Sequence, residues 1–96
     1  MAQVTLINPF EIPKGQEQEA LAHWEKARDF LAGQPGYIST RLHRALDPDA
    51  RFHLVNVAIW ESEAAFRAAT AKMRQELGPP PQGVKGGPAL YEVIRD

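Results

Sequence analysis

An amide and an indole stand four residues apart in an otherwise apolar segment. Residues 51–61 read RFHLVNVAIWE, and the apolar stretch 54–60 within them is interrupted by the polar-tipped side chains of Asn56 and Trp60. In a strand, residues four apart share one face and lie about 13 Å apart along the chain. A buried Asn needs partners and could hold a carbonyl or an oxyanion, while Trp could stack on a flat aromatic ligand. The structural alternative is that Trp60 anchors the core and Asn56 satisfies a backbone group.

Other polar side chains near the ends of apolar segments are further candidates. Asn8, just before Pro9, could line the mouth of a pocket, or it could organise the end of a strand. Tyr91 could donate a hydrogen bond to a ligand or act structurally. The chain has no cysteine, which excludes disulfides and thiolate sites, and its three histidines do not form a metal-binding pattern. We therefore expect no metal site.

The bulk composition predicts one ordinary globular domain over residues 1–96. Hydrophobic residues make up 44%, charged residues 24%, and the net charge is −1. A nucleic acid or an anionic membrane surface would require a basic face, so neither is expected as a partner. No apolar run is long enough to span a bilayer, and residues 1–10 lack the features of a signal peptide. These features favour a cytoplasmic protein.

Hydrophobic periodicity and turn residues divide the chain into strands and helices. Residues 34–36 (QPG), 47–50 (DPDA) and 78–88, rich in Gly and Pro, separate these elements. Strands are predicted at 3–10, 37–46, 51–61 and 89–95, and helices at 16–32 and 62–77. The first strand should end or bend at Asn8-Pro9, because proline cannot donate to a central ladder. The order β-α-β-β-α-β predicts a ferredoxin-like α+β fold, with four antiparallel strands and two helices on one face.

The third predicted strand is apolar on both of its faces, which points to a second covering layer. One face carries Phe52, Leu54, Asn56, Ala58 and Trp60, and the other carries His53, Val55, Val57 and Ile59. Two helices can cover only one side, whereas a strand with one wet face should alternate apolar and polar residues. A second copy of the same sheet would cover the other side with two-fold symmetry. We therefore expect a homodimer, the alternative being a monomer with a mixed surface.

Three segments resemble the antibiotic biosynthesis monooxygenase family, whose fold is the dimeric α+β barrel. They are VTLINPFEIPKG at 4–15, QPGYISTRLHR at 34–44 and VNVAIWESEAAF at 55–66. The resemblance covers nearly the whole chain, and its most specific part runs from Asn56 to Phe66. It implies one of two chemistries: oxidation of polycyclic quinol-type substrates by O2 without a cofactor, or degradation of haem.

The quinol-oxidising members use an Asn and a Trp four apart on the third strand, which Asn56 and Trp60 match. They add a Tyr six residues beyond the Trp, where this chain has Phe66. They also use an Arg on or after the second helix, for which Arg74 and Arg67 are approximate candidates.

The haem-degrading members use an Asn six residues before a Lys in the first turn, which Asn8 and Lys14 match. They also need a His on the second helix, and residues 62–81 contain none. The resemblance therefore implies a monooxygenase that needs no cofactor and acts on a flat hydrophobic molecule. Asn56 and Trp60 would be catalytic, and Asn8, Phe66, Arg74 and Tyr91 would bind substrate. A non-catalytic domain that binds a small molecule in the same pocket is the alternative, followed by a haem protein.

Overall fold

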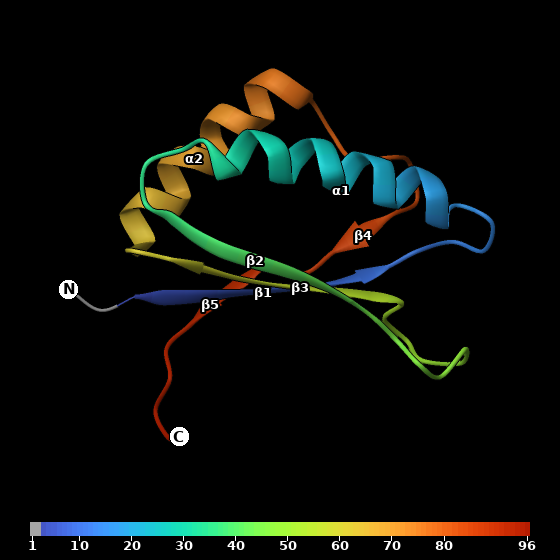
Figure 1. The fold of residues 1–96 in the computed structure, drawn as a ribbon. Helices are drawn as coiled ribbons and strands as arrows, with labels where there is room; N and C mark the ends of the chain where they lie inside the picture. The colour runs from blue at the N-terminus through green and yellow to red at the C-terminus, as the bar shows by residue number, and fades with distance from the viewer. Residues whose placement is uncertain (1–2) are drawn as a thin grey trace.

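Two helices cover one face of an antiparallel sheet in the computed structural model, which describes residues 3–96 (Figure 1). In chain order the elements are β1 (Val4–Glu11), α1 (Glu17–Ala32), β2 (Tyr37–Arg44), β3 (Leu54–Trp60), α2 (Glu63–Leu77), β4 (Lys85–Gly86) and β5 (Ala89–Tyr91). The strand order is β2-β3-β1-β4, and β5 pairs with β1 beside β4. The predicted ferredoxin-like α+β fold is confirmed. β5 corresponds to the last predicted strand, and β4 is an additional short strand within the segment 78–88 that was predicted to be a loop.

The prediction that β1 ends at Asn8-Pro9 is wrong, because the strand continues to Glu11. Pro9 pairs with Val55 of β3, and its carbonyl accepts a hydrogen bond from the N–H of Gly87 at 3.0 Å. The N and O of a strand residue point to the same side. An N–H group at residue 9 would therefore point toward the gap between β4 and β5. Neither strand pairs with β1 at that position, so a proline there removes no hydrogen bond between paired strands.

Three other strands are shorter than predicted. β2 ends at Arg44 rather than 46. β3 begins at Leu54 rather than 51, so the connection from β2 is longer than a tight turn. The last strand ends at Tyr91 rather than 95, since Tyr91 already pairs with Thr5 near the start of β1. Beyond it the chain leaves the sheet on the side away from the helices (Figure 1).

The second helix begins and ends where the sequence predicted, for local reasons. The Ser62 hydroxyl accepts a hydrogen bond from the N–H of Ala65 at 3.1 Å, which satisfies one of the free donors of the first turn. Gly78 ends the helix with φ 70°, and three prolines follow it. The loop that follows therefore leaves α2 at a defined point and returns toward β1.

The core between sheet and helices is divided into two apolar clusters. One contains Leu6, Ala58, Trp60 and Ala69, and the other contains Ile12, Ala20, Leu54 and Val84. In the register of β1 and β3, the pair formed by Asn8 and Asn56 falls between the pairs that contribute to the two clusters. The apolar core is thus interrupted at a row of two amides.

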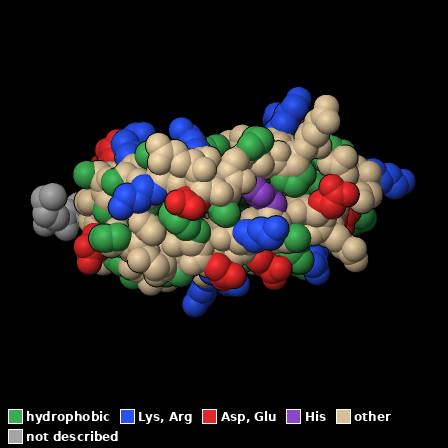
Figure 2. Space-filling model, turned by 90° about the horizontal axis from the view of Figure 1, so that it is seen from above, with side chains coloured by type: hydrophobic (Ala, Val, Ile, Leu, Met, Phe, Trp, Pro, Cys, Tyr) green, Lys and Arg blue, Asp and Glu red, His purple; other side chains and the backbone are tan. Residues whose placement is uncertain are grey.

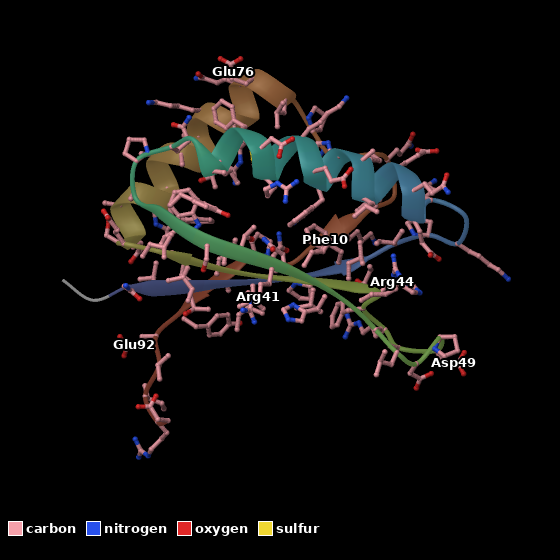
Figure 3. The ribbon with its side chains drawn as sticks, viewed as in Figure 1. Phe10, Arg41, Arg44, Asp49, Glu76 and Glu92 are labelled. Carbon is pink, nitrogen blue, oxygen red and sulfur yellow. The ribbon has the colours of Figure 1, made fainter. Side chains whose placement is uncertain are left out.

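The other face of the sheet is not covered by any other part of residues 3–96. Val55, Val57 and Ile59 lie on it and are only half-buried, whereas the alternate residues of β3 are all buried beneath the helices. Figure 3 shows Phe10 between the sheet and the helices, and Arg41 and Glu92 on the open side. Neither helix of the described residues is long and apolar enough to cross a membrane.

Candidate functional site

A cavity of about 880 Å³ lies between the sheet and the two helices. Its floor comes from β1, β2 and β3, its roof from α1 and α2, and one end from the Gly- and Pro-rich loop after α2. Seen from the helix side, hydrophobic side chains show among the charged ones (Figure 2). The volume of the cavity falls within the range of 300–1,000 Å³ that is typical of small-molecule sites.

The amide row forms the polar part of the cavity floor. Asn8 and Asn56 are direct partners on neighbouring antiparallel strands, and both line the cavity. Side chains at such paired positions lie on the same face with Cβ atoms about 5 Å apart. Asn56 is 9% exposed, and its neighbours along β3 on this face are Leu54 and Ala58, both buried. Two adjacent amides therefore face the same cavity, and the side chains around them are apolar.

Each amide has its oxygen held by the protein. The Thr40 hydroxyl donates to Asn56 Oδ1 at 2.8 Å, and the Gly87 N–H donates to Asn8 Oδ1 at 3.0 Å. A backbone N–H can only donate, so the atom of Asn8 that faces Gly87 is the oxygen. No hydrogen bond from either Nδ2 to another described residue is present, which leaves the N–H donors of both amides for a ligand. The floor of the cavity thus offers paired donors to an oxygen atom.

Trp60 forms a rigid aromatic wall beside the amide row. It is 1% exposed, and its ring makes edge contacts with Tyr37 at 5.6 Å and Phe66 at 5.7 Å between ring centroids. Such edge-to-face pairs favour one orientation of the indole. Because these contacts come from β2 and α2, the ring position depends on the packing of three elements.

The helices supply the remaining polar groups of the cavity. From α1 come His23, Trp24 and Arg28, and from α2 come Arg67 and Arg74. The Arg28 guanidinium lies over the Trp24 ring, 5.2 Å from its centroid. Arg67 pairs with Glu63 one turn earlier on α2. None of the Asp or Glu residues in the described part of the chain lines the cavity.

The structure brings five of the six predicted site residues together. Asn8, Asn56, Trp60, Phe66 and Arg74 all line the cavity, as does the second arginine considered, Arg67.

Tyr91 lies outside this cavity. It is 52% exposed on the open face of the sheet, because its neighbour Leu90 is the residue of β5 that turns toward the helices. Among the described residues no group of three or more His, Asp or Glu side chains could hold a metal ion.

Sequence reasoning missed the residues that orient the predicted ones. Thr40 and Tyr37 support Asn56 and Trp60 from β2. Trp24 and Arg28 form a stacked pair on the cavity side of α1, and their spacing of four along a helix could have indicated a shared face. A comparable signal is absent for Thr40, because a β-bulge between Tyr37 and Ser39 shifts the alternation of β2.

Comparison with characterised proteins gives two similar monooxygenases from Streptomyces. The tetracenomycin-F1 monooxygenase of Streptomyces glaucescens is 34% identical over 71 residues, which are 73% of this chain and 61% of that protein. The deoxynogalonate monooxygenase of Streptomyces nogalater is 34% identical over 70 residues, 73% of this chain and 57% of that protein. The chain thus spans less than two thirds of the length of these relatives.

Solved structures show the same fold over almost the whole chain. A candidate monooxygenase from Shewanella loihica PV-4 has a TM-score of 0.92 and 55% identity, covering 99% of this chain and 97% of that one. The cofactor-independent oxygenase SnoaB from Streptomyces nogalater has a TM-score of 0.74 and 24% identity, covering 100% and 97%. The sequence model of the antibiotic biosynthesis monooxygenase family matches residues 3–73. Because this model matches most of the chain, and the two Streptomyces monooxygenases are 34% identical over 73% of it, the chain belongs to the antibiotic biosynthesis monooxygenase family.

Proposed function

We propose that the protein is a cofactor-independent monooxygenase that oxidises a flat, hydrophobic, quinol- or anthrone-type molecule with O2. The observation that carries this proposal is the amide row, in which the oxygens of Asn8 and Asn56 are held and their N–H groups have no partner among residues 3–96. The row lies in a cavity of about 880 Å³ that has a buried Trp60 on its wall. The two similar Streptomyces proteins are named as monooxygenases.

The proposed reaction needs no electron donor besides the substrate. A ring methylene group flanked by aromatic rings and conjugated with a carbonyl loses a proton and becomes an enolate. The enolate transfers one electron to O2, and the resulting substrate radical combines with superoxide to give a peroxide. Loss of water leaves a quinone carbonyl, so that the methylene group and O2 become a ketone and water. The substrate is oxidised by four electrons, and both oxygen atoms are accounted for.

The side chains would stabilise the negative charge that develops on the substrate during this reaction. The Nδ2 groups of Asn8 and Asn56 would donate to the enolate oxygen, which stabilises the deprotonated form that reacts with O2. Trp60, held by its two edge contacts, would pack against the rings and keep that oxygen over the amides. Arg74 and Phe66 would contact the substrate from α2. Since no carboxylate of the described residues lines the cavity, a lowered pKa of the substrate rather than a strong protein base would drive proton loss.

A binding domain without catalysis is the second candidate. It is favoured by the same lack of a carboxylate and by Phe66, which stands where the resemblance implies a Tyr. Haem chemistry fits the cavity less well. Residues 62–81 contain no His, and the one histidine that lines the cavity, His23, is on the other helix.

Aerobic turnover of a model anthrone, followed by O2 uptake and quinone absorbance, tests the proposal. Spontaneous oxidation without protein is subtracted. Replacing Asn56 by Ala removes a donor to the oxyanion and should lower kcat about a hundredfold. Asn56→Asp keeps the shape but sets a negative oxygen against the enolate, so its rate should fall at least as far.

The matched control is Lys72→Gln, an exposed change on α2 outside the cavity, which should leave the rate unchanged. Equal rates for wild type and Asn56→Ala would refute the role of the amide. Tight binding of an anthrone that stays unchanged in air would favour the non-catalytic domain instead.

We also propose that the protein works as a homodimer through the open face of the sheet. Val55, Val57 and Ile59 are half-buried there, and nothing in the described chain covers them. Two copies related by a two-fold axis would bury this surface against itself, giving the sheet the second layer that an apolar face requires. The apolar residues Val93 and Ile94 are exposed on the same side, beyond the end of β5.

A further inference from the structure

The proposed oxidation begins with the loss of a proton, and one side chain of the cavity is able to accept it. The three arginines that line the cavity are always protonated, and its hydroxyl and amide groups do not take up a proton near neutral pH. No carboxylate of the described residues lines it. The remaining candidate is His23 on α1, because a neutral imidazole has a basic lone pair on one of its ring nitrogens.

The packing of α1 places His23 over the cavity floor near the amide row. Ala20, one turn earlier, belongs to the apolar cluster that contains Leu54. Leu31, near the end of the helix, packs against the other cluster, which contains Ala58. The amide row lies between these two clusters on the sheet. The part of α1 between residues 20 and 31 therefore crosses over the row, and His23 lines the cavity from that part.

The geometry of the reaction calls for a proton acceptor on the helix side. The C–H bond that breaks has to stand perpendicular to the ring plane, because only then can its electron pair enter the conjugated system. The proton therefore leaves from the face of the ring rather than from its edge. A flat molecule that lies on the floor, with its oxygen bound by the amides, turns its other face toward the helices. His23 belongs to that roof.

The imidazole of His23 is not used by the fold. Within residues 3–96, the one hydrogen bond of a histidine side chain joins His43 Nδ1 to the Val55 carbonyl. Both ring nitrogens of His23 are thus without a partner among these residues. The side chain is half-buried, so it faces the cavity and can also pass a proton to solvent.

The other charged and titratable side chains of the cavity favour an anionic substrate. Those that line it among the described residues are Arg28, Arg67, Arg74 and Tyr37. On α1, the exposed Glu19 and Lys26 lie one turn before and one turn after His23 and do not line the cavity. The guanidinium groups would stabilise the enolate that remains once its proton has left.

We propose that His23 is the catalytic base of this oxidation, which rests on the proposed function and extends its mechanism. A ring nitrogen takes one methylene proton, and the electron pair of that C–H bond forms the enolate. After O2 has been added to the carbon, the imidazolium returns the proton to the peroxide anion. The imidazole then takes the second proton of the same carbon as the O–O bond breaks, and the leaving hydroxide receives that proton to become water. The products are the ketone and water, and His23 is neutral again.

Hydrogen exchange in the absence of O2 isolates this step. A model anthrone in D2O under argon should exchange its methylene protons for deuterium faster with wild type than without protein, as measured by NMR. His23→Gln keeps a polar side chain of similar size that is not a base. It should slow the catalysed exchange about a hundredfold, which is the low end of what a general base contributes. Its kcat for O2 uptake in air should fall by a similar factor.

A ligand without a methylene group separates catalysis from binding. Anthraquinone has no such proton to lose, and quenching of Trp24 and Trp60, which both line the cavity, reports its binding. It should bind wild type and His23→Gln with equal affinity. His43→Gln removes an exposed imidazole outside the cavity and should keep the wild-type exchange rate. Added imidazole should restore exchange to His23→Ala but not to Asn56→Ala, because only the former lacks a base.

Each outcome decides a different part of the proposal. Equal exchange rates for wild type and His23→Gln, with both oxidising the anthrone in air, would refute the base while the proposed function stands. Slow exchange that comes with loss of anthraquinone binding, and without rescue of His23→Ala by imidazole, would assign the effect to the shape of the cavity and would also refute the base. If wild type neither exchanges nor oxidises the anthrone, the proposed function fails and the base fails with it.

Discussion

Replacing Thr40 by Val should loosen the Asn56 amide while the shape of the cavity stays almost the same. The Thr40 hydroxyl donates to Asn56 Oδ1 at 2.8 Å, and it is the one side-chain donor that this oxygen has within residues 3–96. Asn56 is 9% exposed, so little water replaces a lost partner. Valine has the size of threonine and lacks the hydroxyl, which makes this substitution a test of the hydrogen bond alone.

The expected changes in stability and in kcat follow from the free energy that one neutral hydrogen bond contributes. Such a bond contributes about 1 kcal/mol net, so it favours the held orientation of the amide over the flipped one by about fivefold. Without it, the amide of Asn56 divides between the two orientations, and in one of them its oxygen faces the substrate oxyanion. Thr40→Val should therefore lower the free energy of unfolding by about 1 kcal/mol and the melting temperature by about 4–8 °C. Its kcat should fall about twofold, far less than the roughly hundredfold expected for Asn56→Ala.

Denaturant unfolding and O2 uptake, at one protein concentration, measure these two effects. Thr40→Ser keeps the hydroxyl and should retain the wild-type rate. In the Asn56→Ala background, Thr40→Val should have no further effect on kcat, because the hydroxyl acts through that amide. A loss of the same size in both backgrounds would show that Thr40 acts by another route. Equal kcat values for Thr40→Val, Thr40→Ser and wild type would refute the orienting role.

Two further predictions concern the fold and the assembly. Gly36 has φ +92°, and an added Cβ would collide with the side chain of Ala65, so Gly36→Ala should lower the free energy of unfolding by at least about 2 kcal/mol. Gly33→Ala, where the new Cβ meets ordinary contacts, should change it little, and equal effects of both substitutions on denaturant midpoints would contradict this reasoning. Val57→Asp places a charge in the middle of the open face and should shift the sedimentation coefficient from dimer to monomer, whereas Val57→Thr should not. A wild type that sediments as a monomer would remove the dimer proposal.

The sequence predicted the parts of the site that depend on a regular period. The side chains of β3 alternate between the two faces of the sheet without interruption. The placement of Asn56 and Trp60 on one face therefore followed from their even spacing along the strand. The prediction that the opposite face of β3 is apolar also followed from this alternation. The order of strands and helices also followed, since the turns between them have clear Gly and Pro signals.

The parts that were missed depend on pairing between distant segments. Thr40 and Tyr37 both face the helices although they are three residues apart, because the bulge in β2 changes the alternation between them. The side chain of Tyr91 was assigned to the pocket, but its face depends on the pairing of Leu90 with Leu6, which lies at the other end of the sequence. Neither feature leaves a local signal in the chain.

The link between Gly87 and Asn8 has a consequence for the evolution and engineering of substrate range. The Gly87 N–H is shared by the Pro9 carbonyl and Asn8 Oδ1, and a Cβ added at Gly86 would come within 3.0 Å of the same oxygen. The loop after α2 thus has two halves with different freedom to vary. The prolines at 79–81 line the cavity without contacting the amide row through hydrogen bonds, so libraries that seek new substrates can vary them. Residues 86–87 should stay fixed, because a change there would alter the hydrogen bond that holds Asn8 Oδ1 as well as the shape of this end of the cavity.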